Sequence, residues 1–424
     1  MPGYLHDVCS AAHPLAAASP FFADFDLPAH GVRMIQPDLA FAHPLDGGRA
    51  VAVSRSVRDT AAGLGPDADW YRKLVGPLVD EWRPLMAAVL APLLRAPRHP
   101  VALARFGLRA LAPTSWLVRR CATQEARAVL AGASAHAGIP LDRPVTGGFG
   151  VLMAVLAHAV GWPIVSGGSQ RLIDALVGAL EAAGGTVRTG VEVTSLAELP
   201  RSAVTMLDVT PRQLLQLDDG RLPDAYRRSL TMFRYGPGTC KVDFALAGPV
   251  PWTAEACRRA GTLHLGGAYE EIASSEAEVA GGKHPDRPYV LVTQPSILDA
   301  TRAPEGHHTL WAYCHVPAGS PVDMSGRIER QIERFAPGFS DLILARHVRT
   351  AAEAPADNPN LVGGDINGGS ADLRQTLFRP NARWPAYRTP VEGLYLCSAS
   401  TPPGGGVHGM CGEYAARTAL RNPR

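Results

Sequence analysis

Hydrophobic positions recur with helical spacing over residues 56–161. Clusters such as YRKLVGPLVDEWRPLMAAVLAPLL place apolar residues three and four positions apart, and prolines interrupt the pattern. We therefore expect a helical subdomain. Within it, residues 145–165 are almost uncharged and nearly long enough to span a bilayer, but glycines, His158 and Pro163 interrupt them. A helix buried inside the protein is the favoured interpretation.

Between residues 233 and 316 the pattern changes to alternation with a period of two. In TCKVDFAL the apolar residues occupy every second position, and Lys241 and Asp243 lie on the opposite face. The segments TLHL, YVLVTQ and TLWAYCHV continue this pattern. They predict an antiparallel or mixed sheet that floors a pocket, with Lys241, Asp243, Tyr313 and His315 as candidate catalytic residues. Each of them could also be a satisfied structural residue.

Two separated pieces show an α/β pattern. In the first, a glycine turn at Gly167 and Gly168 precedes a helix expected over 169–183, and a strand is expected through Val191 and Val193. A short apolar strand ending at Asp208 and a helix beginning at the following proline come next.

The second piece, LYLCSASTPPGGGVHGMCGEYAA, places a triple glycine between a strand and a helix. Glycines let the backbone turn sharply and approach a ligand, and the free N–H groups at a helix N-terminus favour an anion. A triple glycine alone is a weak signal, because many loops use glycines only for turning. His408, inside this turn, is a further candidate for chemistry.

Composition and charge exclude several classes of protein. The 424 residues include 41 basic and 39 acidic side chains, a balance that does not suggest nucleic-acid binding. Seven scattered cysteines without a C-x-x-C pair favour free thiols in the cytoplasm, and we identify no secretion signal. His6, Cys9 and His13 match no zinc spacing, so we expect no metal.

Residues 95–127 are rich in arginine beside leucine, alanine, Phe106 and Trp116. The pattern fits a solvated helix face on a roof over a pocket. It also fits a patch that rests on a membrane surface or admits a lipid-like substrate.

The order of PIVSGGSQRLIDAL, GGTVRTGVEVTSL, LDVTPRQLL and YLCSASTPPGGGVHGMCGEYAA resembles the bacterial phytoene-desaturase-like FAD-dependent oxidoreductases, relatives of the amine-oxidase flavoproteins. The resemblance covers nearly the whole chain, and its C-terminal motif is the most specific part. It implies an FAD cofactor and redox chemistry on a hydrophobic substrate, for which a carotenoid-like polyene is one option. The residues that it assigns to the cofactor are Gly167, Gly168, Val193, Gly404, Gly405, Gly406, Val407 and Gly409.

The chain departs from the family pattern at its beginning. Family members open with a βαβ unit that carries the main pyrophosphate loop, and this sequence opens with MPGYLHDVCSAAHP instead. We expect that unit to be missing, which puts flavin binding in doubt. Three explanations stay open: a late start, a flavin-free isomerase or cyclase in a remodelled pocket, and a non-catalytic subunit completed by another chain.

The expected fold is α/β, with an incomplete Rossmann-like FAD domain and a substrate domain of mixed β-sheet with a helical subdomain. The FAD domain takes residues 1–55, 162–230 and 350–424, and the substrate domain takes 56–161 and 231–349. The expected partner is a hydrophobic small molecule and not a nucleic acid. A peripheral membrane contact, a homodimer and a partner chain stay open, as does membrane association of an otherwise cytoplasmic protein.

Overall fold

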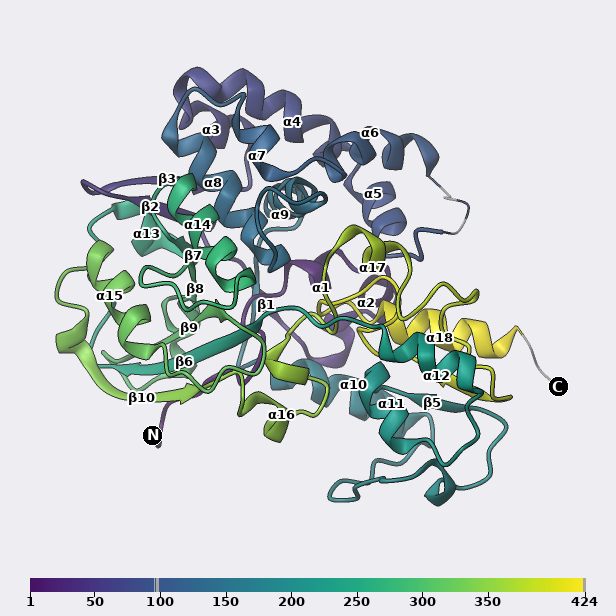
Figure 1. Cartoon of the computed structure of the whole chain (residues 1–424). Coiled ribbons are helices and arrows are strands. Elements are labelled where there is room, and N and C mark those ends of the chain that lie inside the picture. The colour runs from purple at the N-terminus through teal and green to yellow at the C-terminus, as the bar shows by residue number, and fades with distance from the viewer. Residues whose placement is uncertain (95, 97–98, 422–424) are drawn as a thin grey trace.

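A seven-stranded mixed sheet is the largest element of the computed structural model, which describes residues 1–94, 96 and 99–421 (Figure 1). All neighbouring strands are antiparallel except β2 and β7, so the predicted mixed sheet is confirmed. Residues 39–53, which the sequence grouped with the FAD domain, add two strands to it. In spatial order the strands are β10 (Ile343–Arg349), β6 (Gly238–Leu246), β9 (His308–Val316), β8 (Val290–Thr293), β7 (Ala260–Leu265), β2 (Leu39–Leu45) and β3 (Arg49–Val53).

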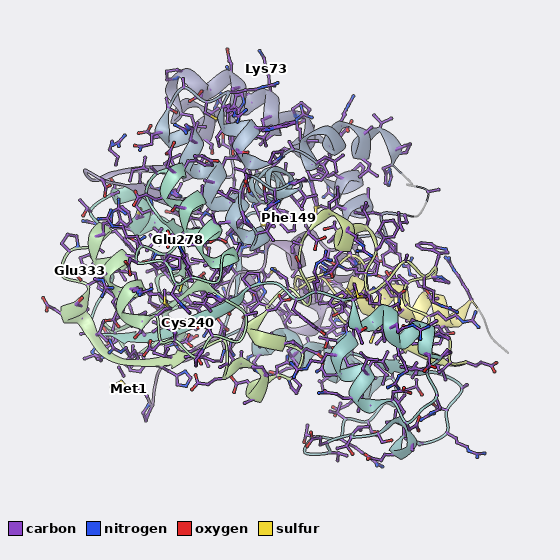
Figure 2. All side chains as sticks on the ribbon, in the orientation of Figure 1. Met1, Lys73, Phe149, Cys240, Glu278 and Glu333 are labelled. Carbon is purple, nitrogen blue, oxygen red and sulfur yellow. The ribbon has the colours of Figure 1, made fainter. Side chains whose placement is uncertain are left out.

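The two faces of this sheet differ in chemistry because alternate residues point to opposite sides. One face is apolar and packs on α13 (Glu255–Arg259) and α15 (Ser325–Phe335). Helix α15 contributes Ile328, Ile332 and Phe335 to this contact, at helical spacing. Cys240 of β6, labelled in Figure 2, belongs to this buried core. The other face carries the polar and aromatic side chains.

The helical subdomain predicted over residues 56–161 is present, and its helices form a layer that covers the β2–β3 side of the sheet (Figure 1). The glycines of its central helix α9 allow close contact, since a Cβ at Gly148 would lie 2.6 Å from the carbonyl oxygen of Ala110. This helix is almost entirely buried within the protein, and among the described residues no helix could cross a membrane. The layer consists of α3 (Val57–Ala62), α4 (Ala68–Asp80), α5 (Trp82–Val89), α6 (Pro100–Ala110), α7 (Thr114–Val118), α8 (Gln124–Ser134) and α9 (Thr146–Ala159).

The remaining elements form the α/β part (Figure 1). Two strands, β5 (Thr205–Leu207) and β11 (Leu394–Leu396), pair in parallel although nearly 190 residues separate them, and β1 (Met34–Ile35) pairs with β4 (Ile164–Val165). The predicted helices after Gly168 and at Pro211 are present. The helices of this part are α1 (Pro14–Ala18), α2 (Pro20–Phe25), α10 (Gln170–Ala182), α11 (Pro211–Leu217), α12 (Asp224–Thr231), α16 (Ala354–Asp357), α17 (Leu373–Leu377) and α18 (Met410–Leu420). Helix α14 (Tyr269–Ala280) instead packs against α8 and β9.

The strand predicted through Val191 and Val193 is wrong. Residues 185–195 run without regular structure, Val191 is 65% exposed and Val193 is half-buried. A strand is held by hydrogen bonds to a neighbouring strand, and within the described residues this segment has no strand partner.

Candidate cofactor and substrate site

Four of the five predicted catalytic residues lie side by side on the polar face of the sheet. The antiparallel register of β6 and β9 sets Lys241 opposite Tyr313 and Asp243 opposite Trp311. His315 follows one pair further along, opposite Thr239. Directly opposed residues on one face have Cβ atoms close enough to interact. The sheet therefore gathers the four predicted side chains into one surface.

The charges of Lys241 and Asp243 compensate each other. Lys241 donates to the Asp243 carboxylate, and both side chains are largely buried. Burial lowers the pKa of Lys241, and the field of Asp243 counteracts part of this effect. The ring of His6 approaches the same carboxylate, with Nδ1 3.8 Å from Oδ1.

His315 forms a second buried pair, with a residue that the sequence did not single out. Its Nδ1 lies 2.9 Å from Oε2 of Glu276, which α14 supplies, and both side chains are at most 3% exposed. Burial opposes the charged imidazolium, but the Glu276 carboxylate outweighs burial and raises the pKa of His315. The polar face therefore holds two neutralised pairs of charges.

The turn at Gly404–Gly409 is tightly packed on one side, and three of its backbone N–H groups have no hydrogen-bond partner among the described residues. A Cβ at Gly405 would lie 2.7 Å from the carbonyl oxygen of Asn367, so only glycine fits there. No hydrogen bond within the described residues uses the backbone N–H groups of Gly405, Gly406 or Val407. Together with the N-terminus of α18, these amides form a seat for negative charge.

His408 holds this turn together. Its Nε2 donates to the carbonyl oxygen of Gly404 at 3.1 Å, and its Nδ1 accepts from the N–H of Met410 at 3.1 Å. Burial lowers its pKa to about 4, so the ring is neutral near pH 7. Because both ring nitrogens are engaged within the turn, the geometry assigns His408 to positioning.

The loop at residues 363–369 connects the sheet face to the glycine turn. Ile366 packs against Trp311 and Tyr313, and Asn367 packs against Gly405. Asp365 fixes the loop by accepting from three backbone amides at 2.7–2.8 Å. One rigid loop therefore touches both halves of the candidate site.

The second predicted glycine turn is already occupied. The N–H of Gly167 donates to Asp299 at 2.7 Å, and the N–H of Ser169 donates to Asp7 at 2.7 Å. Gly168 donates to the carbonyl oxygen of Val165. With two carboxylates bound at its amides, this turn is unsuited to a phosphate.

The residues present therefore fit the cofactor implied by the resemblance at one of the two glycine turns. Gly404, Gly406 and Gly409 have the spacing G-x-G-x-x-G, which the sequence analysis did not recognise because residues 397–403 separate them from β11. Glu276 and the buried Arg379 were also missed. Glu276 lies 39 positions from its partner His315, and Arg379 bonds to backbone carbonyl groups, which every residue type carries, so no local pattern marks either residue.

A groove of about 190 Å³ lies along the N-terminal half of α18. Pro20, Ala88, Leu103, Met410 and Tyr414 contribute to its lining. The groove thus separates the helical layer from the first turns of α18.

Comparison with known proteins agrees with the fold. No protein-family model matches the chain. The chain is 28% identical over 338 residues to pyridine nucleotide-disulfide oxidoreductase domain-containing protein 2 of Rattus norvegicus, with 66% of the chain and 56% of that protein covered. It is 25% identical over 289 residues to the neurosporene-forming phytoene desaturase of Rhodobacter capsulatus, with 62% and 54% covered. The chain thus spans little more than half the length of these relatives.

Among solved structures, an oxidoreductase from Methanosarcina mazei matches with a TM-score of 0.63 and 14% identity over 99% of the chain and 90% of that protein. Putrescine oxidase bound to putrescine matches with a TM-score of 0.57 and 16% identity over 95% and 86%. At such identities these structures show the fold alone. Together with the sequence relatives, they confirm the predicted resemblance: the chain is similar to the FAD-dependent oxidoreductases, and its sequence relatives include carotenoid desaturases.

Proposed function

We propose that this chain contributes the cofactor and substrate site of a flavin-dependent oxidoreductase that removes hydrogen from an apolar substrate. The observation that carries the proposal is the open amide seat at Gly405–Val407, joined to the polar sheet face by the 363–369 loop. FAD, when bound, would supply the acceptance of a hydride equivalent.

The chain's own residues would bind and orient the reactants. The amides of the glycine turn would hold negative charge of the cofactor, and the buried cluster of Ala11, Leu291, Trp311, Tyr313 and Ile366 would exclude water from the reacting atoms. Within the Lys241–Asp243 and His315–Glu276 pairs, the positive and negative charges compensate each other. Such a face suits a neutral apolar molecule better than an ion.

The direct test is to add FAD to the full chain and record the flavin spectrum, and then to mix the complex anaerobically with phytoene. Bleaching of the flavin absorbance supports the proposal. If the chain binds no FAD but converts the polyene without a redox change, the isomerase or cyclase alternative replaces it. Homodimerisation, a partner chain and a cytoplasmic location stay predictions.

We also propose that the helical layer touches a membrane surface. Val101, Leu111 and Trp116 are 61%, 54% and 62% exposed, and α6 carries basic side chains. Of the arginine-rich stretch, Arg95, Pro97 and Arg98 lie outside the described residues. Sedimentation with anionic and neutral lipid vesicles tests the contact, which Trp116→Ser should weaken.

A further inference from the structure

The fold compensates the charge of one of two buried arginines and leaves that of the other without an ion pair. Arg302 is 0% exposed and is bonded to two carboxylates, Asp7 at 3.0 Å and Asp299 at 3.2 Å. Arg379 is 4% exposed, and the ion pairs formed among the described residues do not include it. Its positive charge therefore lies inside the protein without a bonded counter-charge.

The hydrogen bonds of Arg379 go to carbonyl groups. Nε donates to Gln375, Nη1 donates to Ala399, and Nη2 donates to Ser370, all at 3.0–3.2 Å. These bonds orient the guanidinium and satisfy part of its donor capacity. They leave its net charge unbalanced, because a carbonyl carries none.

The acidic side chains whose fields reach Arg379 are engaged elsewhere. Asp365 accepts from the backbone amides of Gly236, Asn367 and Gly369, and burial raises its pKa. Asp372 forms an ion pair with Arg234 at 2.8 Å. Neither carboxyl group makes a hydrogen bond to Arg379 within the described part of the chain.

The guanidinium lies directly against the open glycine turn. A Cβ at Gly404 would come within 2.8 Å of Nη1 of Arg379. The buried charge, the unused amides of the next three residues and the N-terminus of α18 all favour negative charge at the same turn. An unbalanced buried charge is costly, and a ligand of opposite charge would offset that cost.

We propose that Arg379 is the counter-charge for a negatively charged group of the bound cofactor at the Gly404–Gly409 turn. This inference rests on the proposed function, since FAD is the ligand. FAD offers two sources of negative charge, the pyrophosphate and the reduced flavin ring. A fixed buried cation would stabilise either charge. Oxidised FAD already carries the pyrophosphate charge, whereas the ring carries its charge only in reduced FAD.

Titration of Arg379→Gln and Arg379→Lys with oxidised FAD and ADP, followed by measurement of the midpoint potential of bound FAD, tests the assignment. If the pyrophosphate is the partner, Arg379→Gln weakens FAD and ADP binding by about tenfold or more. If the reduced ring is the partner, binding of oxidised FAD is kept, and the variant lowers the midpoint potential because reduced FAD binds about tenfold more weakly. Arg379→Lys, which keeps the charge, should retain most of the wild-type affinity and midpoint potential.

Arg374→Gln is the matched control, because this arginine of α17 is solvent-exposed, and its replacement should change neither quantity. The proposal is overturned if Arg379→Gln leaves both affinity and potential unchanged. It is also overturned if Arg379→Lys keeps the wild-type melting temperature but loses as much affinity or midpoint potential as Arg379→Gln. The hydrogen bonds of Arg379 to the loops, and not its charge, would then explain the effect. If Arg379→Gln does not fold, the lysine variant alone decides.

A wild-type chain that binds no FAD would refute the proposed function separately. Inorganic pyrophosphate then tests the counter-charge by itself. If pyrophosphate raises the melting temperature of the wild-type chain but not that of Arg379→Gln, the assignment is supported. If pyrophosphate does not stabilise the wild-type chain, the assignment is overturned.

Discussion

His315 on β9 and Glu276 on α14 form a buried ion pair, with Nδ1 2.9 Å from Oε2, that joins the polar face of the central sheet to a helix. The pair lies among aromatic rings, since His315 neighbours both Tyr289 and Tyr313. It fixes a charged group on the surface where the predicted catalytic residues gather.

Glu276→Gln should destabilise the protein strongly. Removing one partner of a buried pair leaves an uncompensated charge, at a cost of about 3–5 kcal/mol. Urea denaturation measures the change in the free energy of unfolding. Glu270→Gln on the same helix is the control, because its exposed ion pair with Arg127 should contribute about 1 kcal/mol or less. Equal losses in the two variants would contradict the role of the buried pair.

The stabilising contribution of the His315–Glu276 pair should be lost toward alkaline pH. The folded-state pKa of His315 is raised, so its contribution is complete below the unfolded value near 6.5 and is lost as the pH rises through the folded pKa. Denaturation curves between pH 6 and pH 9 should therefore show a decline that His315→Gln flattens. An unchanged slope in the variant would exclude the pair as its source.

His43 should act in the opposite direction. Its side chain is fully buried, its Nε2 lies 2.7 Å from the carbonyl oxygen of Gly267, and burial lowers its pKa to about 4. A depressed histidine pKa gives stability that is complete above about pH 6.5 and is lost as the pH falls toward 4, by up to about 3 kcal/mol. His43→Gln should make the acid-side decline shallower, whereas the exposed His30→Gln should leave it unchanged. Unfolding experiments from pH 7 to pH 4 compare the two.

Gly405→Ala should abolish tight FAD binding. The new Cβ would lie 2.7 Å from a backbone oxygen of Asn367, so the turn must shift and its unpaired N–H groups must move with it. We expect the affinity for FAD to fall by about tenfold or more, measured by quenching of flavin fluorescence. Gly412→Ala, in the first turn of α18, would place its Cβ more than 4 Å from the neighbouring atoms and should bind as the wild type does. Equal affinities for all three proteins would place the cofactor elsewhere.

Periodicity determined much of the fold from the sequence. The alternation around Lys241 and Asp243 separates the apolar face of β6 from its polar face, and the register of β9 then completes the predicted set of side chains. Glycine positions predicted the turn before α18, because only glycine tolerates the φ of 114° and 130° found at Gly404 and Gly406. These features depend on residues that are neighbours in the sequence, so the sequence alone predicts them.

Only the tertiary structure decided which charges meet. Asp7 and Asp299 occupy the turn at Gly167–Ser169 from 162 and 132 positions away, and thereby remove it as a phosphate seat. Val191 lies in a segment with strand-like sequence that lacks a strand partner among the described residues. Hydrogen bonds and ion pairs between distant segments form only when packing brings the segments together. The spacing of residues in the sequence does not tell which distant residues come into contact.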